Sequence, residues 1–245
     1  MRRMVLLFGG LGIGMSLMWL LLQNAGAELA GLSAPETVLC VAPALQEDVS
    51  STDMEQTVLT LPYQIPGTTL TAERIAAYEG PYLEDCTGDE VVNVAALVLR
   101  NTGQAGVESA QVILYWGDEQ YIFEADTIPA GQSVLVLEKS RSAYAHRSYT
   151  DCIGWQTQAE GDWTAYKYLT VEEVGQGTLA VTNISDSELT NIHLYYKSYL
   201  SPPGIYVGGI TYKVRIRKLE PGQTLQINPP YYARGYSRVA RVTLE

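Results

Sequence analysis

The sequence has few of the residues on which most protein catalysis depends. It contains two histidines and three cysteines in 245 residues. No Cys-x-x-Cys pair is present, and neither histidine has a second one at metal-ligand spacing. The glycine pairs Gly9-Gly10 and Gly208-Gly209 lack the following Lys-Ser or Lys-Thr of a phosphate-binding loop, and no serine or cysteine sits in a nucleophile elbow. The sequence therefore predicts a protein without catalytic residues, metal ligands or a cofactor.

Positive charge and phenylalanine are also scarce. The chain has 16 Lys and Arg against 27 Asp and Glu, a formal net charge of −11. Because nucleic-acid binding needs a basic footprint, we expect no nucleic-acid partner. Two phenylalanines stand against 17 tyrosines, and aromatic rings with a polar end suit thin sandwiches whose core edges meet water. With 47% hydrophobic and 18% charged residues, the composition indicates a globular protein.

The N-terminus carries an export signal. Arg2 and Arg3 precede an uncharged apolar run over residues 4–22, and positive residues before such a run keep the N-terminus in the cytoplasm. At about 1.5 Å per residue the run is long enough to cross a hydrocarbon core of roughly 30 Å and to remain as a membrane anchor. Alternatively, residues 1–27 form a signal peptide that is cleaved after Ala27. Either reading predicts an extracytoplasmic protein, single-pass membrane-anchored or secreted.

Residues 28–75 lack sustained periodicity and are rich in Ala, Thr, Pro, Ser and Gln. This composition predicts a low-order tether. Within it, residues 58–63 can form one strand, and residues 71–77 a helical turn capped by Thr71.

Most of the remaining chain consists of one pattern used twice. Apolar alternating segments at 93–102, 107–115 and 128–135 recur at 179–183, 189–196 and 219–225. Short strands of period two, separated by Asn and Gly turns, indicate an antiparallel sandwich. We therefore predict an all-β chain with two tandem Ig-like antiparallel β-sandwich domains after an N-terminal apolar helix and a tether. The first spans 76–152, a connection spans 153–165, and the second spans 166–245. Relative to the first copy, the second carries an insertion at 201–209, which predicts an exposed loop.

Cysteines and acidic clusters allow two readings each. Cys86 precedes the first strands of the first repeat and Cys152 follows its last. Export permits a disulfide, which would close a loop of roughly 65 residues and contribute about 4 kcal/mol. The alternative is three unpaired thiols, with Cys40 in the tether. The acidic residues Glu84, Asp85, Asp89 and Glu90 indicate solvated turns. The alternative is a weak calcium site near residues 85–90.

Tyrosine and basic residues gather in the second repeat. Eight of the 17 tyrosines lie between residues 195 and 236, and residues 212–245 hold seven Lys or Arg against two Glu. Aromatic faces flanked by cations can bind sugars, anionic wall polymers or an acidic partner. Alternatively, the tyrosines fill the sandwich while the cations coat its outside. The candidate binding patch consists of Tyr196, Tyr199, Tyr206, Tyr212, Lys213, Arg215, Arg217 and Tyr232.

The second repeat resembles a known kind of module. The strand 181–185 is followed by Leu-x-x-Ile-x-Leu-Tyr-Tyr at 189–196 and by Leu-x-Pro-Gly-Gln-Thr at 219–224. This series resembles the FxLYD and CARDB-like extracellular sandwich modules of Gram-positive bacteria, and residues 206–239 resemble exported proteins of Clostridia-type bacteria. The resemblance covers residues 78–245 and implies a sandwich fold without catalytic residues.

These observations predict a non-enzymatic cell-surface protein. Its tandem modules would serve protein interaction or spacing, with an unidentified surface protein as partner. The alternative is a carbohydrate- or wall-polymer-binding module that uses the Tyr/Arg-rich second domain. The membrane is a partner through residues 4–22 if the leader is retained.

Overall fold

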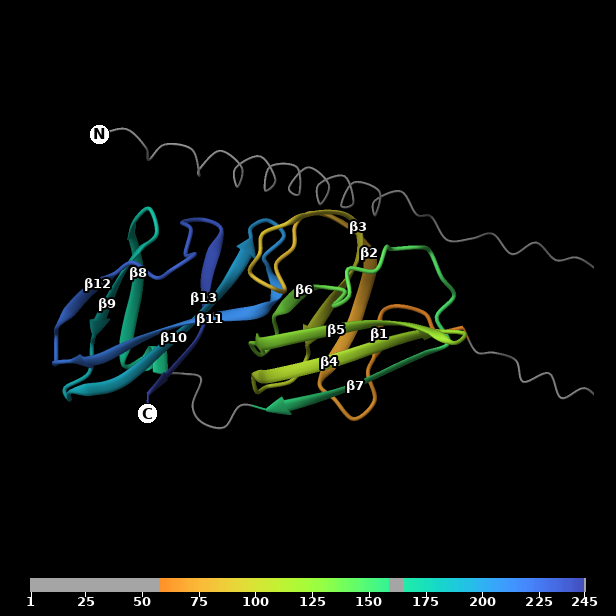
Figure 1. Ribbon diagram of the computed structural model, residues 1–245. Coiled ribbons are helices and arrows are strands. Elements are labelled where there is room, and N and C mark those ends of the chain that lie inside the picture. Colours follow the sequence, from red (N-terminus) through yellow and green to blue (C-terminus); the bar gives the residue numbers. More distant parts are fainter. Residues whose placement is uncertain (1–57, 159–164, 245) are drawn as a thin grey trace, which may run out of the picture. The chain divides into compact units, whose positions relative to one another are not determined.

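The computed structural model describes residues 58–158 and 165–244 (Figure 1). The expected signal peptide or anchor at 1–27 and the tether up to residue 57 lie outside these residues. Within the described part, no helix is long and apolar enough to cross a membrane. That part is all-β, apart from one short 3-10 helix, η1 (Ala165–Lys167).

The strands follow one another as the two repeats predict. The first repeat contains β1 (Tyr63–Gln64), β2 (Leu70–Pro81), β3 (Glu90–Asn101), β4 (Val107–Trp116), β5 (Glu119–Ile128), β6 (Ser133–Leu137) and β7 (Asp151–Gln158). The second contains β8 (Leu169–Gly175), β9 (Thr178–Asn183), β10 (Leu189–Leu200), β11 (Ile205–Leu219), β12 (Thr224–Ile227) and β13 (Ser237–Leu244).

The strands form three sheets, one of which runs through both repeats. The seven-stranded sheet has the order β1-β2-β3-β6-β11-β10-β13, and the three-stranded sheets are β5-β4-β7 and β12-β9-β8. Each repeat pairs its strands in the same way, as β2-β3-β6 with β5-β4-β7 and as β8-β9-β12 with β11-β10-β13. The large sheet therefore joins one layer of the first repeat to the other layer of the second. The joint is the parallel pairing of β6 with β11, with Tyr206 opposite Val134 and Val207 opposite Leu135.

Two hydrophobic cores lie against this large sheet, as the alternating patterns predict. Leu97, Leu99, Val112 and Leu114 are fully buried in the first core. In the second core the fully buried side chains include Val181, Ile192, Leu194 and Val242. Full burial of such a side chain contributes about 1.5–3 kcal/mol, so these inner rows dominate the stability of both repeats.

The cores lie on opposite faces of the large sheet. Tyr196 and Tyr199 are three residues apart on β10 and therefore point to opposite faces of the strand. Tyr196 belongs to the second core, whereas Tyr199 packs against the first. The two small sheets consequently cover opposite faces of the seven-stranded sheet.

The turn after the repeated strand is built identically in both copies. Asn101 is fully buried, and its Nδ2 donates to the carbonyl oxygens of Ala105 and Ile128 at 2.8 and 3.1 Å. Asn183 is also fully buried, and its Nδ2 donates to the carbonyls of Ser187 and Leu219 at 2.8 and 3.0 Å. These bonds confirm the sequence repeat and its asparagine turns.

Two expectations about chain boundaries are wrong. The tether does not extend to residue 75, because Ile65, Leu70 and Ala72 are fully buried in the first core. The expected helical turn at 71–77 is strand β2, where ladder pairing with β3 outweighs the capping tendency of Thr71. At the other end of the repeat, residues 153–158 of the expected connection belong to β7.

The insertion in the second repeat is largely buried. Residues 201–204 form the exposed turn that the sequence predicts, but residues 205–209 continue as the buried start of β11. The prediction of an exposed loop over 201–209 is therefore wrong for its second half. That half supplies the strand that pairs with β6.

Candidate functional site

Strand alternation divides the predicted binding patch. Tyr196, Tyr212 and Tyr232 lie in or against the second core, with ring centroids of Tyr196 and Tyr212 5.6 Å apart and those of Tyr196 and Tyr232 5.5 Å apart. Tyr199 and Tyr206 pack against each other on the first core, with ring centroids 5.1 Å apart.

The basic members of the patch lie elsewhere. Lys213, Arg215 and Arg217 are exposed along β11, alternating with the half-buried or buried Tyr212, Val214 and Ile216. They therefore occupy the face of β11 opposite to the second core, while the tyrosines of that strand point inward. The eight predicted residues do not form one surface.

Two of the predicted tyrosines line a cleft of about 450 Å³ between the repeats, here called the tyrosine cleft. Its walls come from the turn between β5 and β6 and from η1, β8, β9, β11, β13 and the segment before β13. The lining residues are Pro129, Ala130, Gln132, Tyr166, Val171, Glu173, Leu179, Tyr206, Tyr232, Arg238, Val239 and Ala240. The volume falls within the range of small-molecule sites.

Hydrogen bonds fix the polar groups of the tyrosine cleft. The Tyr232 hydroxyl donates to Glu173 Oε1 at 2.6 Å. The hydroxyls of Tyr166 and Tyr206 donate to the carbonyl oxygen of Val239 at 3.3 and 3.4 Å. Both tyrosines are thereby oriented by the backbone of β13.

Arg238 supplies the positive charge of the cleft. Its Nη1 donates to the Tyr199 hydroxyl at 2.9 Å, and its guanidinium carbon lies 5.0 Å from the centroid of that ring. Within the described part of the chain, Arg238 has no ion pair. An arginine that is held by an aromatic ring but not neutralised by a carboxylate can accept an anion.

Burial keeps the cleft tyrosines protonated. It raises the pKa of Tyr206 to about 12, against a smaller lowering by the charge of Arg238. It also raises the pKa of Tyr166 and of Tyr232 above the usual range, and Arg238 again partly opposes the shift. Near neutral pH, all three hydroxyls are therefore donors as well as acceptors. The guanidinium lies close enough to influence each of them.

A second polar site lies where β6 and β11 diverge. Glu84 places its carboxylate between the two strands, and Oε1 accepts from the Leu137 N–H at 2.8 Å while Oε2 accepts from the Gly209 N–H at 2.5 Å. On the other side of Gly209, the fully buried Lys197 donates through Nζ to the carbonyls of Asp126 and Gly209 at 2.7 and 2.9 Å. A side chain of the first repeat and one of the second thus extend the backbone pairing at the joint.

The two buried charges at the joint shift in opposite directions. Burial raises the pKa of Glu84 to about 7, although hydrogen bonds from Leu137 and Gly209 and the charge of Lys197 lower it in part. Burial lowers the pKa of Lys197 to about 8, although Glu84 and Asp126 raise it in part. Each charge is therefore costly to bury, and each partly stabilises the other.

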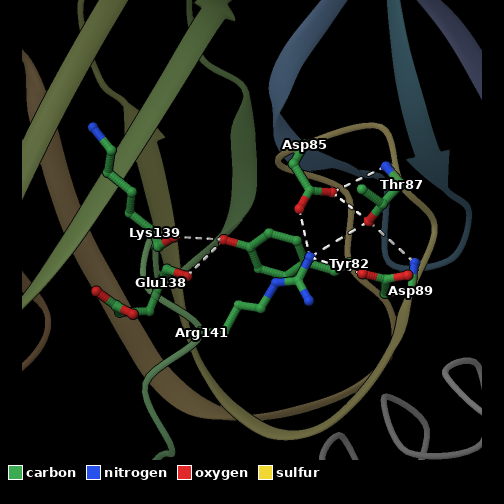
Figure 2. A network of polar contacts seen from close by, with 7 residues as sticks. All are labelled: Tyr82, Asp85, Thr87, Asp89, Glu138, Lys139 and Arg141. Atoms are coloured by element: carbon green, nitrogen blue, oxygen red, sulfur yellow. Dashed lines mark hydrogen bonds and ion pairs between the residues drawn. The ribbon is translucent and has the colours of Figure 1, made fainter.

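Figure 2 shows how the loop that carries Glu84 is held. The Tyr82 hydroxyl lies 2.9 Å from the carbonyl oxygens of Glu138 and Lys139. Above its ring, at 4.4 Å from the centroid, lies the Arg141 guanidinium, whose Nη2 contacts Asp85 at 2.5 Å and Asp89 at 3.1 Å. We call residues 82–89 the junction loop.

Thr87 completes this loop. Its backbone N–H and its hydroxyl both donate to Asp85 Oδ1, at 3.0 and 2.6 Å. These bonds, followed by the interaction with Arg141, lower the pKa of Asp85 to about 2. Asp85 and Asp89 thus both contact Arg141, and no group of acidic, histidine or cysteine side chains in the described part is arranged to hold a metal ion.

The cysteines stay apart. Cys152 is fully buried in the first core, where burial raises its pKa to about 12. Cys86 is exposed in the junction loop beside Tyr212, where burial and, after it, the neighbouring thiol raise the pKa of Tyr212 to about 12. Both are free thiols, so the expected Cys86–Cys152 bond is not formed. The predicted bond required Cys86 and Cys152 to lie close together because they flank the first repeat in the sequence. In the structure, Cys86 lies beside Tyr212 of the second repeat instead.

The sequence indicated an acidic turn at Glu84 but gave no role in the joint to Glu84 or Lys197, and none in a site to Arg238. One signal for the joint was present in the Gly208-Gly209 pair. A Cβ atom at Gly209 would lie 2.0 Å from the Glu124 carbonyl oxygen and 2.5 Å from Glu84 Oε2, so this close approach needs glycine. A second signal is Lys197 itself, a charged residue within an otherwise apolar strand.

No protein-family model matches the chain, and no curated protein matches it either.

Proposed function

We propose that the chain is a non-enzymatic, exported or membrane-anchored surface protein with two Ig-like sandwich modules of the FxLYD/CARDB-like type. The modules act as one stiff unit that spaces or presents an interaction surface for another protein. The observation that supports this proposal best is the seven-stranded sheet that runs through both repeats.

The joint is built to resist bending. Besides the β6–β11 ladder, Glu84 and Lys197 connect the repeats through partly buried hydrogen bonds. Arg241 of β13 adds an ion pair to Glu108 of β4 at 3.1 Å. Opening the joint would break these hydrogen bonds, each worth about 0.5–1.5 kcal/mol. Modules that only needed to be connected would not require such an interface.

Distances between spin labels on the two repeats test the stiffness. Val92 in β3 and Ile184 after β9 are 70% and 54% exposed, so cysteines at these positions can be labelled in the full chain. Cys40 and the exposed Cys86 are replaced by serine, whereas the fully buried Cys152 is left in place. We expect one narrow distance distribution, which broadens in Gly209→Val. A broad distribution in the parent protein would contradict a stiff spacer.

We propose carbohydrate or wall-polymer binding as a second function, because the tyrosine cleft combines aromatic rings with oriented polar groups. Retention of the full chain on deproteinised cell walls tests it. Tyr166→Ala should weaken retention, because this ring lines the cleft and is 41% exposed. Tyr231→Ala is the matched control, because Tyr231 is 75% exposed and does not line the cleft. Equal retention of both variants would contradict binding in the cleft.

A further inference from the structure

Arg238 is the one basic residue among the described walls of the tyrosine cleft. The chain is acidic, with 27 Asp and Glu against 16 Lys and Arg, yet the described part offers this guanidinium no ion-pair partner. Glu173 is the one acidic residue among the described cleft walls, and its Oε1 already accepts from the Tyr232 hydroxyl at 2.6 Å.

We propose that the tyrosine cleft binds a sugar residue that carries an anionic substituent, either a carboxylate or a phosphate. Arg238 binds the anionic group, the ring of Tyr166 packs against the sugar, and Glu173 accepts a hydrogen bond from a sugar hydroxyl. This inference rests on the second of the two functions proposed above.

The geometry of Arg238 favours an anion. A guanidinium has five N–H donors, and only Nη1 has a hydrogen-bond acceptor among the described residues, the Tyr199 hydroxyl. The remaining donors can bind a carboxylate or phosphate in the two-pronged manner that arginine favours. The hydroxyl protons of Tyr166 and Tyr206 are already donated to the Val239 carbonyl, so the donors for the anion come from Arg238.

The other walls favour a sugar over a bare anion. Glu173 would repel a small anion but accepts from hydroxyl groups. Tyr166 leaves 41% of its surface exposed, and an aromatic face of this kind suits the apolar face of a sugar ring. A cleft of about 450 Å³ also exceeds what a lone phosphate would fill.

Three related compounds test the proposal by calorimetry on the full chain. Glucose, glucuronic acid and glucose 6-phosphate share one ring and differ in the presence and kind of anionic group. We expect at least one of the two anionic compounds to bind about tenfold or more tightly than glucose, because charge-assisted hydrogen bonds are the stronger ones. Which of the two binds better identifies the substituent as carboxylate or phosphate.

Variants locate the effect. Arg238→Gln should abolish the preference for the anionic sugar, while Arg238→Lys should restore part of it, because lysine keeps the charge but loses the two-pronged geometry. Arg215→Gln is the matched control, since it removes an exposed positive charge from β11 outside the cleft. Both Arg238 and Arg215 are exposed, so neither replacement should unfold the protein, and a thermal melt verifies this.

Each other outcome overturns the inference in a recognisable way. Equal binding of all three compounds would mean a cleft that binds sugars without regard to charge. Binding of inorganic phosphate as tight as that of glucose 6-phosphate would mean an anion site without sugar recognition. If none of the compounds binds, the inference fails, while retention on cell walls decides independently whether the broader polymer-binding function stands.

Discussion

The two repeats share one construction and differ in how their sheets end. Asn101 and Asn183 make the same pair of side-chain bonds to backbone carbonyls in the two copies. In the first repeat, however, β6 has neighbours on both sides, whereas the corresponding β12 of the second repeat lies at the edge of its sheet. The hydrogen bonds within a repeat are thus the same in the two copies. The copies differ in whether the edge strand of a sheet, β6 or β12, pairs with a strand of the other copy.

Two departures from the repeat meet at the joint. The first copy has the junction loop of residues 82–89, where the second has only a short turn between β8 and β9. The second copy has the extended start of β11. Glu84 from the one contacts Gly209 from the other. The comparison teaches that the insertions add contacts at the joint to those made by Lys197 and Arg241 of the repeated strands.

Gly209→Val should break the joint and have the largest effect. Its Cβ would lie 2.0 Å from the Glu124 carbonyl oxygen, so backbone must move, and we expect a loss of about 3 kcal/mol or more. Gly175→Ala is the control, because its nearest neighbour would be Thr178 at 3.4 Å, and it should cost less than about 1 kcal/mol. Urea unfolding measures both. A similar cost for the two would mean that the joint adds no stability.

Asn101→Ala and Asn183→Ala test whether the copies are energetically as well as geometrically alike. Each substitution leaves two buried carbonyls without their donor, which costs about 1–3 kcal/mol. We expect equal losses in unfolding free energy in the same urea titrations. A loss confined to one copy would show that only that turn is needed for folding.

Glu84→Gln should weaken the joint by about 1–3 kcal/mol, because the amide nitrogen of glutamine would face a backbone N–H, two donors together. The pH dependence of the unfolding free energy gives a second test of the role of Glu84. The pKa of Glu84 is about 7 in the folded protein, against about 4.3 in an unfolded chain. Between these values the folded state binds more protons, so stability falls as pH rises.

This slope should shrink in Glu84→Gln, as measured by urea unfolding across that pH range. An unchanged slope would contradict the assignment of the raised pKa to Glu84. Lys197 contributes the opposite slope at higher pH: its pKa is lowered to about 8, so stability should rise from about pH 8 to pH 10.4.

Changes in the junction loop should have the smallest effects on stability, because its ion pairs are partly exposed. They are better detected as pKa changes. Thr87→Val and Arg141→Gln should each raise the pKa of Asp85 from about 2, because the side-chain bond from Thr87 is the largest cause of its lowering and the hydrogen bond and charge of Arg141 add to it. Carboxyl titration by NMR measures both. A larger effect from Arg141→Gln would show that the ion pair dominates.

The sequence is a good guide to what depends on local pattern. Inner rows such as Leu97 and Leu99 and the asparagine turns follow from period two and from turn chemistry. The end of the tether was missed because Ile65 and Leu70 are separated by Pro66 and Gly67 and show no periodicity. In the predicted binding patch, Tyr212 and Lys213 are consecutive residues of one strand, so their side chains lie on opposite faces. The prediction grouped them because they are close in sequence and did not apply this alternation.

Contacts between segments that are distant in the chain could not be predicted from the sequence. Nothing in the junction loop distinguishes the partly buried Glu84 from its neighbour Asp85, because their environments depend on where β11 passes. The separation of Cys86 from Cys152 has the same origin. The tyrosine cleft gathers residues from both repeats, and the pairing of β6 with β11 is a long-range contact that helps to bring these walls together.

The β6–β11 pairing also has a consequence for biosynthesis. The first repeat leaves the ribosome before the second, and domains generally fold in that order. Until Tyr206 and Val207 emerge, the edge of β6 that they will pair with has no partner. An open sheet edge is a template for pairing with other chains. Stalled or truncated chains that end after the first repeat should therefore aggregate more readily than the complete protein.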